Sequence, residues 1–325
     1  MSHQVLPPPV SADPAAAARA APPSRRGRRG QWPTILAHLT PAAVVLIGLL
    51  GYPLYQLVVI SLYDYGQEQA TGHAPLEFLG LGNYTRLLDD PRFWTVLGQT
   101  VVFAAACVIG TLLVGFALAV LATRVRALPR TLLFLAALGA WATPAVAGST
   151  TWLFLFDADF GLVNEVLVWL GLDGMAGYSW TYDRWVAFGL VAGEVIWCSF
   201  PFVMITLYAG IRAIPGEILE AAALDGASTW RTTRSVVLPM LRPLLVVVTI
   251  QSVIWDFKVF TQVWVITDGG GVAGRNLVLN VYAYQQAFAG NEFGLGSAIG
   301  VVMTLLLLGF TVVYLRAMRR SGEEL

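Results

Sequence analysis

Three ionisable residues lie inside long apolar runs of this 325-residue chain, where a charge is costly and by default marks a functional position. They are Glu194, Asp256 and Lys258. Two uses fit their chemistry. A carboxylate and an ammonium can form a structural ion pair inside a helix bundle. Alternatively, a carboxylate can accept hydrogen bonds directly from a polar solute, and Asp256 is the better candidate for that role.

Polar and aromatic side chains near these charges are typical of a path for a hydroxyl-rich solute. Aromatic rings stack on the apolar faces of sugar rings, while carboxylates and amides hydrogen-bond to the hydroxyl groups. An aromatic side chain in an apolar segment can also serve only in packing or as an interfacial anchor. The candidates for the path are Trp197, Gln251, Trp255, Asp256, Tyr282, Tyr284 and Gln285.

The chain lacks the residue patterns of an enzyme. Lys258 is the only lysine, and Phe257 before it rules out the Gly-Lys-Ser/Thr pattern of a nucleotide-binding loop. No Ser/His/Asp or Cys/His arrangement suggests catalysis, and the three histidines are too scattered to predict a metal site. Cys107 and Cys198 fall in apolar runs, where they behave as small hydrophobic residues, so no disulfide is expected. We therefore predict no catalytic residue, metal or cofactor in this chain.

Composition places these residues in a membrane. The chain is 57% hydrophobic and 12% charged, with a mean hydropathy of +0.67, whereas soluble domains carry about 25% charged residues. The net charge of zero gives no basic surface for nucleic acid. Six apolar stretches are long enough to cross a bilayer, which takes about 20 residues. They predict an all-α protein with six transmembrane helices, near residues 34–62, 94–122, 131–155, 186–209, 242–266 and 296–317.

The two ends of the chain differ from this apolar domain. Residues 1–31 contain almost no large apolar residues, so we expect a disordered tail. Its arginine cluster precedes an apolar run that is too long for a signal peptide, and this run is therefore the first span. The membrane domain is expected over 32–320, followed by a short tail at 321–325.

The arginines predict the orientation. Fifteen of them fall in the tails and in the loops on one side of the six spans, and four fall on the other side. Because cytoplasmic loops carry the excess of positive charge, both termini and the loop at about 211–240 are expected in the cytoplasm.

The depth of Glu194 in the membrane, counted in residues from the cytoplasmic end of its span, predicts a partner for it. Glu194 and Lys258 each lie roughly 15 residues from the cytoplasmic ends of neighbouring spans, or about 22 Å along a helix. We therefore expect an intramembrane ion pair between them. Asp256, two residues before Lys258, would lie on another face of the helix and could face the solute.

The loop between the fourth and fifth spans, at about 211–240, is predicted to form two short helices joined by a bend. Gly226 sits where a helix C-terminal residue with positive φ is needed, Ser228 or Thr229 can cap the next helix, and Pro239 is expected to end it. The spacing of these residues resembles the EAA loop of ABC-importer permeases. The matching residues are Glu220, Ala221, Ala222, Gly226, Val236, Leu238 and Pro239. The resemblance implies that coupling to an ATPase uses Glu220, Ala221, Ala222, Asp225, Gly226, Leu238 and Pro239.

Other segments extend the resemblance to nearly all of residues 35–320. Residues 78–84 and 90–94 look like the segment before the second span of carbohydrate-importer permeases, and 257–260 with 266–270 resemble their fifth-span motif. Thr261 and Gly271 depart from the usual Asp and Pro of that motif. The resemblance is to the maltose and glycerol-3-phosphate branch of type I (MetI-like) permeases.

That resemblance implies the function and the partners. The chain would be a permease subunit in the bacterial inner membrane that translocates a sugar or small oligosaccharide. Its partners would be a second, homologous permease, a cytoplasmic ATPase dimer that binds ATP and Mg²⁺, and an external solute-binding protein. The Glu220 loop would couple the ATPase to the spans. Two alternatives stay open, namely the same fold importing glycerol-3-phosphate or another small polar solute, and a secondary transporter driven by an ion gradient.

Overall fold

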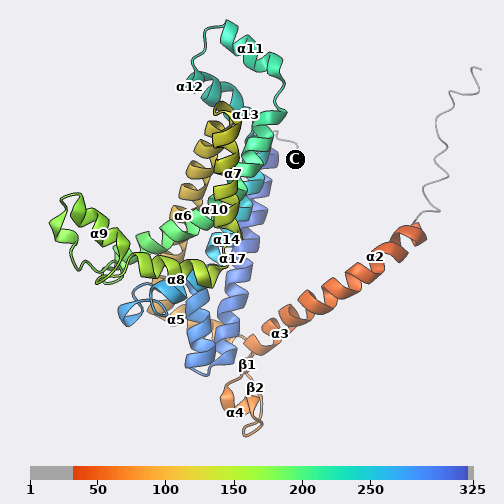
Figure 1. The fold of residues 1–325 in the computed structure, drawn as a ribbon. Coiled ribbons are helices and arrows are strands. Elements are labelled where there is room, and N and C mark those ends of the chain that lie inside the picture. Colours follow the sequence, from red (N-terminus) through yellow and green to blue (C-terminus); the bar gives the residue numbers. More distant parts are fainter. Residues whose placement is uncertain (1–31, 321–325) are drawn as a thin grey trace, which may run out of the picture. The chain divides into compact units, whose positions relative to one another are not determined.

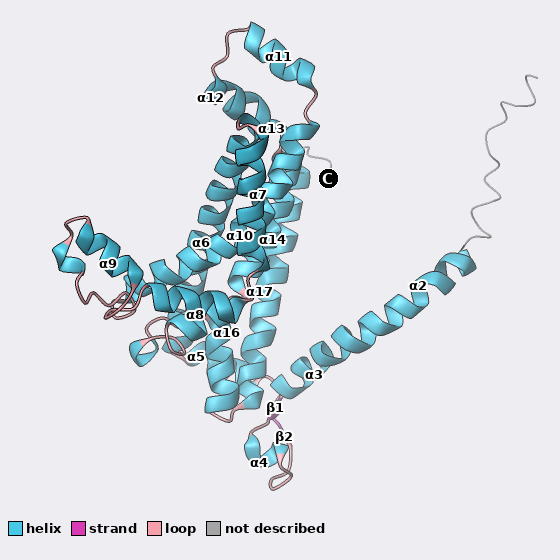
Figure 2. Cartoon of the chain, in the orientation of Figure 1, coloured by secondary structure: helices cyan, strands magenta, loops and turns pink. Residues whose placement is uncertain are grey.

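The computed structural model describes residues 32–320, and the two tails expected at 1–31 and 321–325 lie outside the described residues. Helices dominate the described chain (Figure 2), which confirms the predicted all-α class. One two-residue ladder adds to it, with β1 (Tyr63–Asp64) antiparallel to β2 (Glu77–Phe78). The chain divides into two units, the first ending at Gln56 and the second beginning at Leu57.

The first unit consists of apolar helix. It contains α2 (Trp32–Leu46), a π-helical turn η3 (Ile47–Gly51) and the start of α3 (Tyr52–Ser61). The stretch Leu36–Ser61 is long and apolar enough to cross a membrane. Its large apolar side chains are exposed, for example Ile47 and Leu49 at 69% and 70%.

The second unit is a bundle of long helices (Figure 1). Its helices follow the chain in order as α4 (Gln67–Ala70), α5 (Gly82–Asp89), α6 (Pro91–Arg124), α7 (Ala127–Ala142), α8 (Ala145–Leu155), α9 (Leu162–Trp169), α10 (Arg184–Ala213), α11 (Gly216–Leu224), α12 (Thr229–Thr232), α13 (Leu238–Met240), α14 (Arg242–Phe257), α15 (Thr261–Ile266), α16 (Leu279–Tyr284) and α17 (Phe293–Arg320). Short 3-10 and π segments complete it, namely η4 (Asp173–Met175), η5 (Thr233–Val237), η6 (Val272–Gly274) and η7 (Gln285–Ala289).

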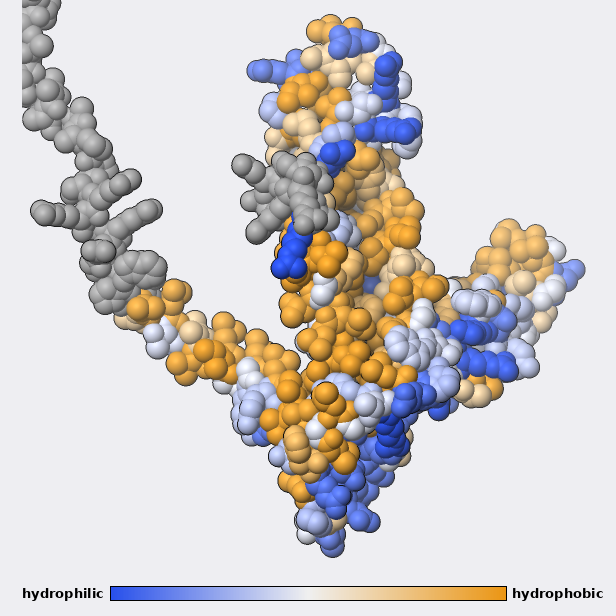
Figure 3. Space-filling view, turned by 180° about the vertical axis from the view of Figure 1, so that it is seen from behind, coloured by the Kyte–Doolittle hydropathy of each residue, from blue (hydrophilic) through white to orange (hydrophobic). Residues whose placement is uncertain are grey.

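Four of the predicted spans in this unit are helical, three as the single helices α6, α10 and α17 and the fifth span as α14 followed by α15. The candidate spans are Pro91–Arg124, Arg184–Ala213, Arg242–Ile266 and Phe293–Arg316. Hydrophobic surface covers the middle of the bundle, whereas hydrophilic surface gathers at its two ends (Figure 3). An apolar belt between two polar ends is what a bilayer requires, since lipid chains cannot solvate charged side chains.

The third span differs from the prediction of a continuous helix over 131–155. It is broken into α7 and α8, which are bent by 104° at Thr143–Pro144. Thr143 takes an extended ψ of 123°, because the ring of a following proline disfavours the α conformation. The bend turns α8 across the bundle instead of along it.

Close packing of α6 against α10 forms the centre of the bundle. Gly115 of α6 lies opposite Val203 of α10, and a Cβ on Gly115 would come within 2.7 Å of Val203 Cγ1. Gly110 approaches Ile196 in the same way. Small residues let two helix backbones approach this closely inside a membrane protein. The glycines thus allow α6 and α10 to pack side by side.

Candidate functional site

The loop between α10 and α14 folds as a helical hairpin at one end of the bundle (Figure 1). Helix α11 ends in a Schellman motif, in which Ala227 N donates to Ala222 O and Gly226 N donates to Ala223 O, each at 3.0 Å. Gly226 has a φ of +73°, which confirms the left-handed conformation predicted for it. The bend is therefore fixed by backbone hydrogen bonds and by one glycine.

The second half of the hairpin confirms one predicted feature and corrects another. Ser228 caps α12, since its Oγ accepts from Arg231 N at 3.4 Å. Pro239 does not end the helix at Leu238, as we expected. The helix continues through the π-helical η5 into α13 and ends only after Met240, with Leu241 as its C-cap. Pro239 lies just after the π-helical η5, at the second residue of α13.

Two large apolar side chains, which the sequence reading missed, project from this hairpin. Leu224 at the end of α11 is 89% exposed and Trp230 in α12 is 72% exposed. No described part of this chain covers these two side chains. Glu220, Ala221 and Asp225 lie exposed on the same hairpin.

A cavity of about 220 Å³ lies where the break between α7 and α8 meets α10, α14 and α15. Three of the predicted path residues line it, namely Gln251, Trp255 and Asp256. The other lining residues that the sequence reading missed are Trp141, Thr143, Ala145, Val195, Cys198, Ser199, Phe202, Ser252, Val259 and Gln262. Pro144 was the available signal for Trp141 and Thr143, because a proline in a span predicts a break there.

Asp256 is the only acidic or basic side chain that lines this cavity. It is 1% exposed, and neither carboxylate oxygen has a hydrogen-bond partner among the described residues. Buried carboxylates are normally paired or hydrogen-bonded, since an unsatisfied one is costly. The wall around it offers an amide in Gln251, hydroxyl groups in Ser199 and Ser252, and the half-exposed indole of Trp255. The cavity can therefore hold a ligand that donates hydrogen bonds to a carboxylate and stacks on an aromatic ring.

The remaining predicted path residues lie elsewhere. Trp197 packs against Trp152, with ring centroids 6.3 Å apart. Tyr284 packs on Trp264 at 5.0 Å, and Gln285 donates to Gly269 O at 2.7 Å. These three side chains have structural contacts outside the cavity lining. Tyr284 and Gln285 follow the end of α14 at Phe257, whereas Trp197 lies in α10.

The expected ion pair between Glu194 and Lys258 is wrong. Glu194 is fully buried and accepts a hydrogen bond from Ser149 Oγ at 2.8 Å, while Lys258 is exposed. The only ion pair in the described chain joins Arg86 to Glu292. Depth counting failed because it assumed a straight helix through Lys258. Helix α14 ends at Phe257, so Lys258 turns away from α10.

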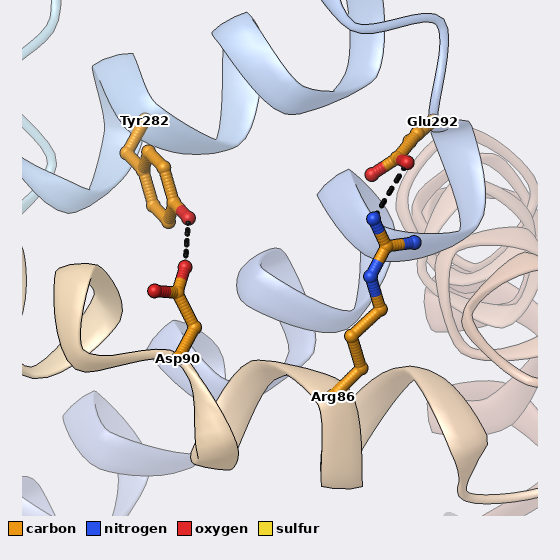
Figure 4. Close-up of polar contacts among 4 residues, drawn as sticks. All are labelled: Arg86, Asp90, Tyr282 and Glu292. Atoms are coloured by element: carbon orange, nitrogen blue, oxygen red, sulfur yellow. Dashed lines mark hydrogen bonds and ion pairs between the residues drawn. The ribbon is translucent and has the colours of Figure 1, made fainter.

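Tyr282 belongs to a group of polar contacts with Arg86, Asp90 and Glu292 (Figure 4). Its hydroxyl donates to Asp90 Oδ2 at 2.9 Å, and the guanidinium of Arg92 lies 5.7 Å from its ring centroid. Arg86 and Glu292 form the ion pair nearby, at 2.7 Å. Burial and Asp90 raise the pKa of Tyr282 to about 12. The network ties α16 and the start of α17 to α5 and α6.

Comparisons with known proteins agree with this architecture. Residues 112–321 match the family described as binding-protein-dependent transport system inner membrane component. The chain is 40% identical over 286 residues to the diacetylchitobiose uptake system permease protein DasB of Streptomyces coelicolor, covering 88% of this chain and 87% of that protein. It is 34% identical over 281 residues to the trehalose/maltose transport system permease protein MalF of Thermococcus litoralis, covering 86% and 92%.

Solved structures show the same fold. A crystal structure of a bacterial ABC transporter for import of the acidic polysaccharide alginate aligns with a TM-score of 0.76, covering 92% of this chain and 99% of that chain at 16% identity. These matches show to which family the protein belongs, and the Glu220–Pro239 hairpin agrees with them. The chain belongs to the binding-protein-dependent transport system inner membrane components, the membrane-spanning permease subunits of ABC importers.

Proposed function

We propose that this chain is one of two membrane-spanning permeases in an ATP-driven importer of a sugar or small oligosaccharide. The cargo is delivered by an external binding protein, and both chain termini lie in the cytoplasm. The observation that carries the cargo assignment is Asp256, a buried carboxylate with two free acceptor oxygens in a cavity that also exposes Trp255. Sugars match such a wall because they donate hydrogen bonds at their edges and stack through their faces.

The names of the relatives support this cargo class. They include permeases for diacetylchitobiose, trehalose or maltose, and arabinooligosaccharides. The alternative cargo glycerol-3-phosphate fits less well. Asp256 is the only charged side chain lining the cavity, and its carboxylate would repel a phosphate.

The hairpin of α11, α12 and α13, which we call the coupling hairpin, supports an ATPase partner. We infer that Leu224 and Trp230, both strongly exposed, enter an apolar cleft of a cytoplasmic ATPase subunit, with Glu220 and Asp225 at the polar rim. ATP and Mg²⁺ bind to that partner, so this chain itself carries no catalytic step. Closure of the ATPase dimer moves the hairpin, and the rigid helices α10 and α14 on either side of it transmit the movement to the cavity.

The test of this proposal is the Asp256→Asn variant of the full complex in nanodiscs. Removing the charge from the carboxylate while keeping its size should leave assembly with the ATPase normal and lower sugar uptake at least about tenfold, as expected from the loss of a charge-assisted hydrogen bond. Asp159→Asn, which changes an exposed carboxylate outside the cavity lining, is the control and should transport normally.

Two results would contradict the proposal. Unchanged uptake by the Asp256→Asn variant would show that the sugar does not pass through this cavity. Uptake that follows an imposed ion gradient, without ATP and without a bound ATPase, would instead identify a secondary transporter.

A further inference from the structure

Helix α9 turns four large apolar side chains to one exposed side. Leu162, Val166, Trp169 and Leu170 are spaced at i, i+4, i+7 and i+8, which places them on a single helix face. Their exposed fractions are 55%, 43%, 83% and 63%. We call these four residues the α9 stripe. Exposed aliphatic and aromatic residues gathered in this way mark an interaction surface.

The stripe is a fixed surface, because the other face of α9 is anchored. Asn164 is buried, and its side-chain amide donates to Tyr178 O at 2.9 Å and to Asp157 O at 3.3 Å. Trp180 Nε1 donates to Asn164 Oδ1 at 2.7 Å. These bonds fix the helix rotation, so the stripe cannot turn inward without breaking a buried polar network.

The location of α9 brings the stripe next to the apolar belt. Helix α7 starts beside the coupling hairpin and runs away from it, and α8 then carries the chain sideways to α9 (Figure 1). Hydrophobic surface covers the upper end of this lobe, on the side of the coupling hairpin, while hydrophilic surface covers much of its flank (Figure 3). Helix α8, which connects the bundle to this lobe, also carries exposed apolar side chains, at Val146 and Phe154.

Charge and aromatic content identify the partner. From Phe156 to Asp183 the chain has five carboxylates and no lysine or arginine, so the segment has no electrostatic attraction to anionic lipid or acidic protein. Trp169 adds a strongly exposed indole to those of Trp94 and Trp185, which lie at the first turns of α6 and α10. Exposed tryptophans at the ends of spans are typical of the membrane interface.

We propose that the α9 stripe binds a lipid surface: it lies in the interface of the bilayer, with Leu162, Val166 and Leu170 among the acyl chains and Trp169 at the headgroups. Binding depends on apolar burial, as for an interfacial amphipathic helix, and does not require anionic lipid. This role goes beyond solute transport. It anchors the segment that follows the bent third span, and thereby holds α8 across the cavity.

Quenching by labelled lipids tests the proposal directly. The full-length chain carries Cys198→Ser, and Cys107 is fully buried, so that a fluorescent thiol probe reaches only an introduced cysteine of this chain. The chain is purified with its co-expressed partner subunits, and the labelling of the complex without an introduced cysteine is subtracted as background. One protein carries the probe at Val166→Cys in the stripe. The matched control carries it at Asp173→Cys, an exposed position in the same lobe.

Nanodiscs are made from zwitterionic phosphatidylcholine with or without a nitroxide on the acyl chain. We expect the nitroxide to lower the fluorescence at Val166 by roughly twofold or more, as for a probe within about 10 Å of the acyl chains, and to leave the Asp173 probe nearly unchanged. Only proteins that retain their partner subunits at the normal ratio are compared, so a misfolded variant does not enter the result.

Three outcomes would overturn the proposal. Equal quenching at the two positions would show that the stripe has no special contact with lipid. No quenching at Val166 in the assembled complex would show that the stripe is kept away from the acyl chains, as it would be if a partner subunit covered it. Quenching that disappears when the external binding protein is added would assign it to that protein. None of these readouts depends on the sugar or on ATP, so the test is independent of the proposed cargo.

Discussion

Ser149 Oγ donates a hydrogen bond to Glu194 Oε1 at 2.8 Å, and this bond joins α8 to α10 inside the bundle. Both residues are fully buried. Gly148 lies beside them, and a Cβ there would come within 3.1 Å of the same oxygen. A buried glutamate thus holds the crossing half of the third span against the fourth span.

The first prediction concerns this bond. Ser149→Ala leaves Glu194 Oε1 without its donor, which should cost about 1–3 kcal/mol and lower the yield and the midpoint of thermal denaturation of the complex. Thr150→Ala is the control, because Thr150 is exposed and bonds only within its own helix, to Val146 O. Lys258→Met should leave stability unchanged. If Lys258→Met lowered the stability of the complex and the additional substitution Glu194→Gln recovered it, the two side chains would form the ion pair that the structure contradicts.

The second prediction concerns Gly226. A Cβ there would have no atom within 4 Å, so a substitution acts only through the positive φ. Gly226→Leu should strain the bend by roughly 1–2 kcal/mol, weaken the copurification of the ATPase and lower transport. Gly226→Asn should be milder, because asparagine adopts this conformation more readily. Equal ATPase binding by both variants and the normal protein would exclude the hairpin as the coupling element.

The third prediction uses two glycines of α6. Gly115→Ala places a methyl group against Val203 of α10, and overpacking of this kind should destabilise the protein by about 1–3 kcal/mol. Gly98→Ala meets no atom within 4 Å, so it should be neutral or slightly stabilising through helix propensity. Thermal denaturation of the two variants in detergent checks the difference, and indistinguishable midpoints would contradict the close approach of α6 to α10.

The fourth prediction concerns Tyr282. Tyr282→Phe removes the donor to Asp90 and should lower stability by about 1 kcal/mol. Tyr284→Phe, on a half-exposed ring that packs against Phe260 and Trp264, is the control. Arg86→Ala should have a smaller effect, because the exposed ion pair with Glu292 is worth at most about 1 kcal/mol.

The same tyrosine predicts a pH dependence. Its pKa is raised from 10.0 to about 12 by burial and by Asp90. Above pH 10 the unfolded chain would lose the phenol proton more readily than the folded chain, so stability should fall as the pH rises towards 12. Tyr282→Phe should remove this part of the alkaline destabilisation, which denaturation curves at several pH values would measure.

Much of the architecture follows from the sequence, because its signals are local. The length of the apolar runs predicts the spans, and the spacing from Glu220 to Gly226 predicts the helix end that the Schellman motif forms. The cavity was only partly predictable. Trp255 and Asp256 could be predicted because an aromatic residue and a carboxylate are adjacent in one apolar run. Trp141 could not, because it reaches the cavity only where α7 ends beside it.

The ion pair between Glu194 and Lys258 was wrongly predicted because both spans were assumed to be straight helices. No proline marks the end of α14 at Phe257, so Lys258 was counted at the depth of Glu194 although the backbone leaves the helix there. The partner of Glu194 is Ser149, which lies forty-five residues earlier and meets it only through the 104° bend. A contact that depends on such a bend cannot be found from spacing along either span.

The bend between α7 and α8 also constrains how the chain is made. Helix α7 has 16 residues and α8 has 11, so each half falls short of the about 20 residues that cross the hydrocarbon core. During synthesis the two halves must therefore enter the bilayer together, as one apolar segment. Glu194, which holds α8 in its crossing position, leaves the ribosome later, with the next span. The third span thus reaches its final bent shape only after insertion, when α10 has been made and Glu194 can bond to Ser149 of α8.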